Sequence, residues 1–198
     1  MTMKSVELNS RTVTFTAVMV AVANALSALS IGLTRVGQVG FDLSHVATFI
    51  GAIYGGPILG FLIGLLGGIV PGIHFGPLGG LAWLGLIGLP IGKSLTGLTT
   101  GTLYKVFDIR RRANPSLLTI PVVLLGYVPE CLFTILFFIT LVPYFLGPQP
   151  WVTLSTLTFI LVKAWVEISI MSALMGALTG NLGFSSLVTS ILTVRKAQ

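Results

Sequence analysis

Residues 42–80, DLSHVATFIGAIYGGPILGFLIGLLGGIVPGIHFGPLGG, decide the fold of this 198-residue chain. They contain two apolar segments, 45–54 and 57–73, which are joined by Gly-Gly-Pro at 55–57. A helix needs about 20 residues to cross the ~30 Å hydrocarbon core of a bilayer. The first segment is too short to span a membrane alone, and the second is borderline. Because neither suits a water-facing surface, we expect both to be buried in a larger apolar bundle.

Glycines recur at four-residue spacing in both segments, at Gly51 and Gly55 and again at Gly60, Gly64 and Gly68. Residues four apart lie on the same face of a helix. A face lined by glycines lets two helix backbones approach closely, which takes the place of hydrophobic attraction inside lipid. We therefore expect this stretch to pack closely against other helices.

The composition indicates an integral membrane protein. Hydrophobic residues make up 54% of the chain and charged residues only 8%, whereas soluble domains carry about 25% charged residues. The mean hydropathy is +1.00. The apolar runs are continuous and do not alternate, which excludes a β-barrel. The length allows one compact bundle, so we expect a single all-α membrane domain over residues 1–198.

Six apolar segments predict a compact bundle of six transmembrane helices in the cell membrane. Their approximate ranges are 12–31, 42–54, 57–73, 81–107, 117–146 and 152–178, and an interfacial tail follows at 184–198. Six crossings leave both termini on one side. The basic residues on that side are Lys4, Arg11, Lys105, Arg110, Arg111, Arg112, Arg195 and Lys196, whereas an outer loop holds only Arg35. The positive-inside rule makes the basic side cytoplasmic. Lipid head groups then account for the net charge of +6, and no nucleic-acid partner is expected.

Four charged residues lie inside apolar segments: Lys93, Glu130, Lys163 and Glu167. Each would cost at least ~2.5 kcal/mol near the bilayer centre if it faced lipid, so we expect them to point inward. One interpretation is purely structural, with Lys163 and Glu167 paired along one helix face and Lys93 paired with Glu130. The other is a polar pocket for a small hydrophilic solute, with Trp83 available to stack on a ring.

Three further ionisable residues, Asp42, His45 and His74, lie at the ends of the apolar segments in the 42–80 stretch. Intramembrane ionisable groups are candidate functional residues. The two histidines give only a weak metal signal, because neither has a partner at ligand spacing and the lone Cys131 cannot build a cluster. His74 is either a substrate contact or a hydrogen-bonding residue in an outer loop. No phosphate-binding glycine motif or nucleophile–base spacing indicates an enzyme.

Ala17, Ala21 and Ala25 form a small-residue ladder, AxxxAxxxA, in the first segment. Such a face either packs inside the bundle or provides a flat surface on which another membrane subunit docks.

The chain resembles the substrate-binding S components of energy-coupling factor (ECF) transporters over nearly its whole length. The resemblance rests on the alanine ladder, on Phe-Asp-Leu-Ser at 41–44 and on Gly-Pro-Ile-Leu-Gly at 56–60. It implies a six-helix vitamin binder with cytoplasmic termini and no cofactor. It also implies that Ala17, Ala21 and Ala25 contact a transmembrane coupling subunit, and that two separate ATPase subunits hydrolyse ATP.

Within this family, Asp-Leu-Ser at 42–44 and Lys163 most resemble the riboflavin-binding branch, which places a lysine of the sixth segment in its ligand pocket. Glu130 and Glu167 depart from what a neutral ligand would need, and Phe137-Phe138 lacks the expected amide. Binders of folate, pantothenate, pyrimidines or queuosine precursors therefore stay open.

We expect the segments 32–41, 71–80 and 146–151 to close over the ligand. Two other classes of function fit the same residues. A stand-alone secondary transporter or channel would use Glu130 and Glu167 for proton coupling, and a ligand-free assembly subunit would use the internal charges only to join helices.

Overall fold

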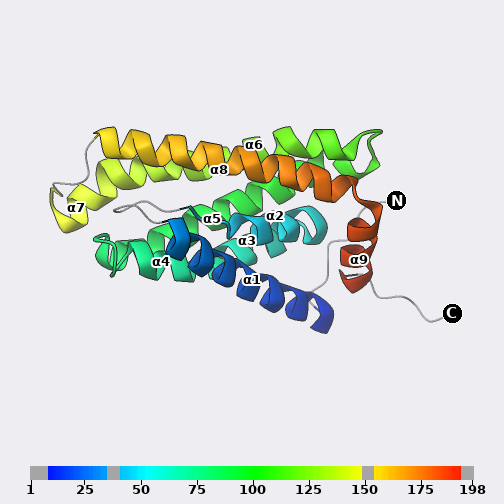
Figure 1. The fold of residues 1–198 in the computed structure, drawn as a ribbon, viewed down its shortest axis with the longest axis horizontal. Coiled ribbons are helices and arrows are strands. Elements are labelled where there is room, and N and C mark those ends of the chain that lie inside the picture. Colours follow the sequence, from blue (N-terminus) through cyan, green and yellow to red (C-terminus); the bar gives the residue numbers. More distant parts are fainter. Residues whose placement is uncertain (1–8, 35–40, 149–153, 193–198) are drawn as a thin grey trace.

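The computed structural model describes residues 9–34, 41–148 and 154–192, and within these ranges the regular structure is entirely helical (Figure 1). Its elements, in chain order, are α1 Ser10–Thr34, α2 His45–Ile50 with the π-helical turn η1 Gly51–Gly55, α3 Pro57–Gly67, α4 Ile69–Phe75, α5 Ala82–Val106, the short η2 Ile109–Arg111, α6 Pro115–Leu136 with the π-helical turn η3 Phe137–Leu141, α7 Val142–Leu146, α8 Leu154–Gly180 and α9 Leu182–Leu192. The predicted all-α class is confirmed.

Four helical stretches in the described residues are long and apolar enough to cross a membrane, which indicates a membrane protein. They are Ser10–Thr34, Pro57–Phe75, Pro115–Leu146 and Leu154–Gly180. Helix α5 is 25 residues long, but its many Gly and Thr residues and its two lysines make it less apolar than these four. The stretch His45–Gly55 is too short to span. Six crossings therefore stay a prediction.

Helix α5 lies in the middle of the bundle (Figure 1). It packs against α3 and α4 on one side and against α6 on the other, and α6 in turn packs along α8. Helix α1 covers α3 and α4 from outside. Most helices run along the long axis of the molecule, whereas α9 crosses one end (Figure 1).

The contact between α3 and α5 is made by glycines. A methyl group at Gly60 would lie 2.6 Å from the carbonyl oxygen of Gly97, and one at Gly97 would collide with the backbone of Gly60. Gly64 meets the backbone of Lys93 in the same way. The two backbones thus touch directly, and the close approach predicted from the glycine spacing is confirmed.

The hinge between η1 and α3 depends on Gly56, which has φ 89°. L-residues with a side chain rarely adopt this conformation. Pro57 follows as the first residue of α3, where its missing N–H is tolerated. Gly51 and Gly55 face the side chains of Ile63 and Leu59, so the short α2–η1 stretch folds closely back on α3.

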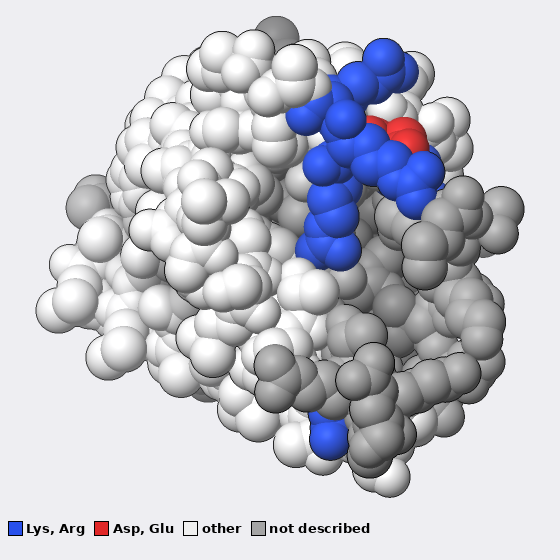
Figure 2. All heavy atoms as spheres, turned by 90° about the vertical axis from the view of Figure 1, so that its right-hand side faces the viewer, with Lys and Arg blue, Asp and Glu red and all other residues white. Residues whose placement is uncertain are grey.

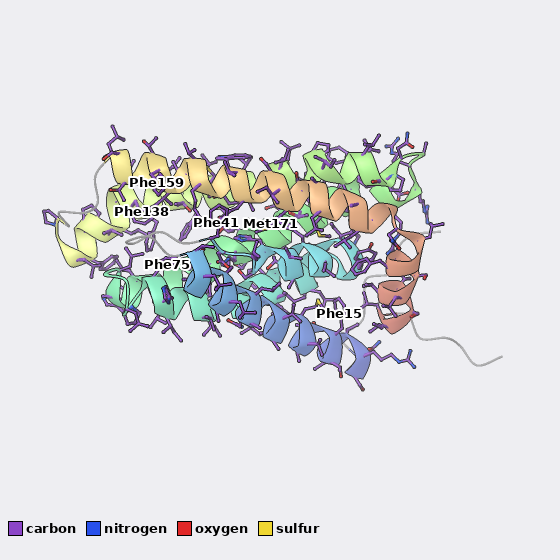
Figure 3. The ribbon with its side chains drawn as sticks, viewed as in Figure 1. Phe15, Phe41, Phe75, Phe138, Phe159 and Met171 are labelled. Carbon is purple, nitrogen blue, oxygen red and sulfur yellow. The ribbon has the colours of Figure 1, made fainter. Side chains whose placement is uncertain are left out.

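The apolar core consists of two clusters. The larger contains Phe15, Phe49, Met171 and Met175 and reaches α9. The smaller contains Leu81, Phe137, Phe138, Val142 and Leu157. Figure 3 shows Phe15 near α9, and Phe75 and Phe138 towards the opposite end. The candidate site lies between the two clusters.

Exposed basic side chains gather at the end of the molecule that carries α9 and the start of α1 (Figure 2). In the described part of the chain they are Arg11, Lys105, Arg110, Arg111 and Arg112. Arg110 donates to Thr189 of α9 over 3.2 Å and lies over the ring of Tyr54 at 5.4 Å. Four other residues of the predicted charge pattern, Lys4, Arg35, Arg195 and Lys196, lie outside the described residues, as do both chain ends and parts of the predicted closing segments.

Candidate functional site

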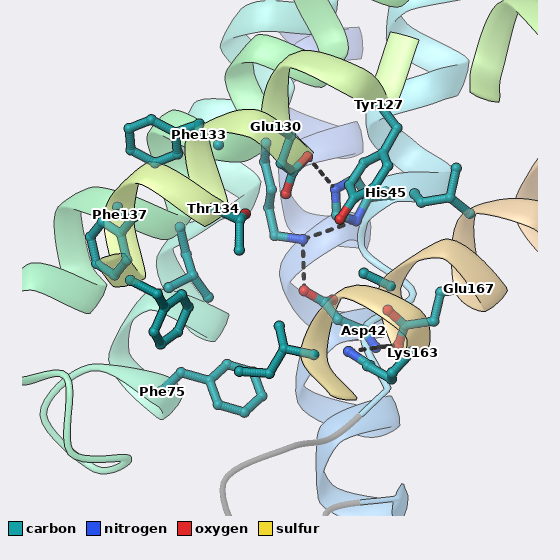
Figure 4. Close-up of a pocket in the computed structure, with 18 of the residues that line it drawn as sticks. Asp42, His45, Phe75, Tyr127, Glu130, Phe133, Thr134, Phe137, Lys163 and Glu167 are labelled. Carbon is teal, nitrogen blue, oxygen red and sulfur yellow. Dashed lines mark hydrogen bonds and ion pairs between the residues drawn. The ribbon is translucent and has the colours of Figure 1, made fainter. Parts of the chain in front are cut away.

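A cavity of about 150 Å³ lies between α5, α6 and α8 (Figure 4). The chain after α4 and the residues that lead into α2 complete its wall. Its lining residues are Asp42, His45, Phe75, Gly79, Leu81, Gly88, Leu89, Gly92, Lys93, Tyr127, Glu130, Phe133, Thr134, Phe137, Phe138, Ile160, Lys163, Ala164, Glu167 and Ile168.

One part of the cavity wall is aromatic. Phe133, Phe137 and Phe138 come from α6 and η3, and Phe75 comes from the last turn of α4. A π-helical turn adds a residue to the helix and so re-aims the side chains that follow it. A methyl group at Gly88 would collide with the Phe137 ring, so this glycine makes room for the aromatic wall.

The opposite part of the wall is polar and is centred on Lys93, which is only 2% exposed. Its Nζ lies 2.6 Å from Asp42 Oδ2, 2.6 Å from Ser44 Oγ and 3.2 Å from His45 Nδ1. An ammonium group has three hydrogens and no lone pair. These three partners therefore use its whole donor capacity, and Asp42 is its ionic partner.

The bond from Lys93 assigns the proton of the His45 ring. Because the ammonium can only donate, we assign Nδ1 as the acceptor, which places the ring hydrogen on Nε2 and leaves the ring uncharged. A ring protonated on both nitrogens would instead form an ion pair with Glu130. Nε2 in turn donates to Glu130 Oε2 over 2.9 Å. The Thr96 hydroxyl donates to the same oxygen. The other carboxylate oxygen of Glu130 turns away from His45 towards the cavity, as Figure 4 shows.

A second ion pair lies on α8, where Lys163 Nζ is 2.9 Å from Glu167 Oε1. The same oxygen accepts from the backbone N–H of Asp42 over 2.7 Å, which ties the two ion pairs into one network. Lys163 also lies over the ring of Phe41 at 5.9 Å. The predicted Lys163–Glu167 pair is thus present.

The predicted pairing of Lys93 with Glu130 is wrong. Lys93 instead pairs with Asp42, because the chain entering α2 brings that carboxylate directly to the ammonium. The network therefore contains three carboxylates and two ammonium groups. Asp42 and Glu167 each have a lysine, whereas Glu130 has only the neutral donors His45 and Thr96. With His45 neutral, the net charge is −1.

Two hydroxyl groups that line the cavity have no hydrogen-bond partner among the described residues: those of Tyr127 and Thr134. Tyr127 is only 3% exposed. Sequence reasoning missed both residues, although their spacing contains the signal. They lie three residues before and four after Glu130 on α6, and therefore on its face of the helix. Thr96 likewise follows Lys93 by three.

The structure does not bring His74 and Trp83 to this cavity. His74 lies in the last turn of α4, half-buried, with its ring against Phe75. Trp83 is 47% exposed and its ring meets Phe145 edge to face. Of the eight residues predicted to bind substrate, the cavity lining includes Asp42, His45, Lys93, Glu130, Lys163 and Glu167.

Ala17, Ala21 and Ala25 are all exposed on α1. The buried face of that helix instead presents Phe15, Ala23 and Ile31, together with Thr12, Ser27 and Ser30. The alanine ladder therefore does not pack inside the bundle formed by this chain.

Comparison of the chain with protein-family models, with curated proteins and with solved structures finds no match. Within the described ranges, no group of three His, Cys, Asp or Glu side chains is placed to hold a metal ion. Chemically, the site offers hydrogen-bond acceptors and donors beside an aromatic wall, an arrangement typical of small-molecule pockets.

Proposed function

We propose that this chain is the substrate-binding S component of an energy-coupling factor transporter, and that its cavity binds a vitamin-like solute for uptake. The cavity itself is the observation that carries the proposal. Lys93, Glu130 and Glu167 lie near the middle of their helices, where ionisable groups are rare and mark substrate pathways. Charges that served only to join helices would not need an adjoining cavity with unpartnered hydroxyl groups.

The proposed topology has six crossings with both termini in the cytoplasm. Basic residues at one end of the bundle support this orientation, because cytoplasmic segments carry an excess of Lys and Arg. Phe75 and the chain that follows α4 lie towards the other end, so the solute would enter from outside. Helices α2 and α5 would be the other two crossings, surrounded by the four more apolar helices.

The proposed partners are a transmembrane coupling subunit and two ATPase subunits. The chain itself is not proposed to be an enzyme. Support comes from Ala17, Ala21 and Ala25, which are exposed at four-residue spacing along α1 and leave a shallow face for a second helix.

The size of the cavity bears on the solute. An apolar cavity of about 150 Å³ in another protein holds a single benzene ring. The cavity of this chain has a similar volume of about 150 Å³, which favours a one-ring solute over riboflavin with its three fused rings. Riboflavin stays a prediction, now less favoured than smaller vitamins and their precursors.

Thermal shift of the detergent-purified protein across a panel of vitamins and their precursors tests this function. A ligand at about 100 times its Kd adds about 2.7 kcal/mol to the free energy of unfolding. In proteoliposomes, the chain alone should bind the solute without accumulating it, and accumulation should require the coupling and ATPase subunits with ATP. A panel without any stabilising solute would contradict the proposal.

A second candidate is a stand-alone proton-coupled transporter. It is favoured by Glu130, a carboxylate in a predicted span that has no cationic partner among the described residues. In that case a pH gradient would drive uptake by this chain in vesicles with no other subunit and no ATP.

A further inference from the structure

We infer that the solute carries one positive charge, on an amine or amidine attached to a single flat ring, and that Glu130 is its counter-ion. This inference rests on the proposed function and names the chemical class of the substrate. Three observations lead to it: the charge balance of the network, the free polar atoms around Glu130, and the aromatic wall beside them.

The charge balance singles out Glu130. The Lys93 ammonium gives its three hydrogens to Asp42, Ser44 and His45. Lys163 is bound to Glu167. Both lysines are therefore neutralised by other carboxylates, and Glu130 keeps an uncompensated negative charge. A buried charge without an ionic partner is unfavourable. A cationic solute supplies that partner, whereas an anionic one would add to the imbalance.

The free atoms around Glu130 suit a group with several N–H donors. One of its oxygens accepts from His45 and Thr96, and the other faces the cavity (Figure 4). The hydroxyl groups of Tyr127 and Thr134 lie one helical turn to either side on α6 and can accept further N–H groups. Tyr127 lines the cavity, and its hydroxyl makes no hydrogen bond within the described structure, so it can bind a group that enters the cavity.

The aromatic wall indicates that the uncharged part of the solute is a flat ring. Phe75, Phe133 and Phe137 line the cavity beside the polar network. A flat ring packs on such a wall through stacked or edge-to-face contacts. Lys163 lies at the Glu167 side of the cavity and would repel a cation there, so the charged end of the solute is directed to Glu130.

The test compares three probes of the same ring and nearly the same shape: benzamidine, which is cationic, benzamide, which is neutral, and benzoate, which is anionic. Binding to the full chain in detergent is measured by thermal shift and by calorimetry at neutral pH. Benzamidine should raise the melting temperature, and benzamide and benzoate should leave it unchanged at the same concentration. Stabilisation by benzoate or benzamide equal to that by benzamidine would overturn the inference, as would no stabilisation by benzamidine.

The variant Glu130→Gln keeps the shape of the side chain and removes the charge. Benzamidine affinity should fall by about 10-fold to 100-fold, the range of a charged hydrogen bond. Asp108→Asn is the matched control. It removes one carboxylate at the basic end, where Asp108 pairs with Arg111, and Asn tolerates its φ of 46°. Unchanged affinity in Glu130→Gln would overturn the inference. If that variant does not fold, the comparison of the three probes on the natural sequence decides the matter alone.

The vitamin panel separates this inference from the proposed function. Stabilisation by a neutral or anionic vitamin, with none by cationic solutes, would overturn the inference and leave the proposed function standing. Absence of stabilisation by every panel member and by benzamidine would overturn both.

Discussion

The two sides of α5 are built in opposite ways from the same kinds of residue. On the side of α3, glycines bring the two backbones into direct contact and leave no space. On the side of α6 and α8, Gly88 and Gly92 leave room for the Phe137 ring and the Glu130 side chain, and a cavity remains. Glycine thus makes close packing on one side and space for a ligand on the other.

This difference suggests that the α3–α5 contact contributes mainly to stability and that the α5–α6–α8 side contributes mainly to ligand binding. The α3–α5 contact contains backbone atoms that cannot move aside, so it forms a rigid half of the bundle. On the α5–α6–α8 side, Thr96 of α5 donates to Glu130 of α6, and the hydroxyl groups of Tyr127 and Thr134 face the cavity without a hydrogen bond in the described structure. Glu130 is hydrogen-bonded but has no lysine partner among the described residues. We therefore expect substitutions in the α3–α5 glycine contact to affect folding. Substitutions in the cavity should affect mainly ligand affinity, except those at Lys93 and Asp42.

The largest expected effect comes from Lys93, which belongs to both sides of α5. Lys93→Met leaves the buried Asp42 carboxylate without its ion pair, and such a loss typically destabilises a protein by about 3–5 kcal/mol. Chemical unfolding in detergent measures the change. The double variant Lys93→Met with Asp42→Asn should recover most of the stability. A single variant as stable as the natural chain would show that this ion pair is not needed for folding.

The next largest effect is expected from a substitution that disturbs only the α3–α5 contact. Gly97→Ala places a methyl group against the backbone of Gly60, and overpacking of this kind costs about 1–3 kcal/mol. The matched control is Gly32→Ala on α1, where an added methyl group meets nothing within 4 Å. In a helix this control should be neutral or should stabilise by up to about 1 kcal/mol. Equal melting temperatures for the two variants would contradict a direct backbone contact between α3 and α5.

The third prediction concerns the cavity side alone. Lys163 gives one hydrogen to Glu167, which leaves donors for an acceptor atom on the ring of the solute, at the end away from its cationic group. Benzamidine has no such acceptor, so its affinity should not fall in this variant. Lys163→Met should weaken solute binding by about 1.5–3 kcal/mol, the scale of a charged hydrogen bond, while the protein still inserts and purifies. If Lys163 and Glu167 only stabilise the fold and do not contact the solute, a different result follows. The double variant Lys163→Met with Glu167→Gln should then restore both stability and full affinity. Calorimetry and melting temperatures on both variants decide between them.

The smallest expected effect on the isolated protein comes from Ala21→Leu. Because Ala21 is exposed on α1, the larger side chain should change neither the melting temperature nor solute affinity. Uptake by the assembled transporter should be lost, since close helix packing leaves no room for added methylene groups. Loss of binding in parallel with uptake would show that this face is not a docking surface.

Much of this architecture follows from sequence patterns. Continuous apolar segments predict the all-helical membrane class, and the four-residue spacing of Gly60, Gly64 and Gly68 predicts the close contact of α3. The cost of intramembrane charge predicts that Lys93, Glu130, Lys163 and Glu167 point inward. All four line one cavity.

The pairing of these charges did not follow, for a physical reason. Periodicity within one helix identifies Lys163 with Glu167 as neighbours, but nothing local relates Asp42 to Lys93, which are far apart in the chain. Their contact depends on the path of the chain into α2. The π-helical turn at Phe137–Leu141 could not be predicted either. It adds one residue and so shifts the helical phase, which a regular helical periodicity does not indicate.

The most direct test of the central claim, that the cavity between α5, α6 and α8 binds the solute, is protection of a cysteine placed in it. Cys131 is the chain's one cysteine, so Cys131→Ser gives a background for single probes. Thr134→Cys reports from the cavity, and Ser186→Cys on the exposed face of α9 is the control. Solute found in the panel should slow thiol labelling at position 134 in proportion to its occupancy and leave position 186 unchanged. Equal labelling at position 134 with and without saturating solute would contradict the account.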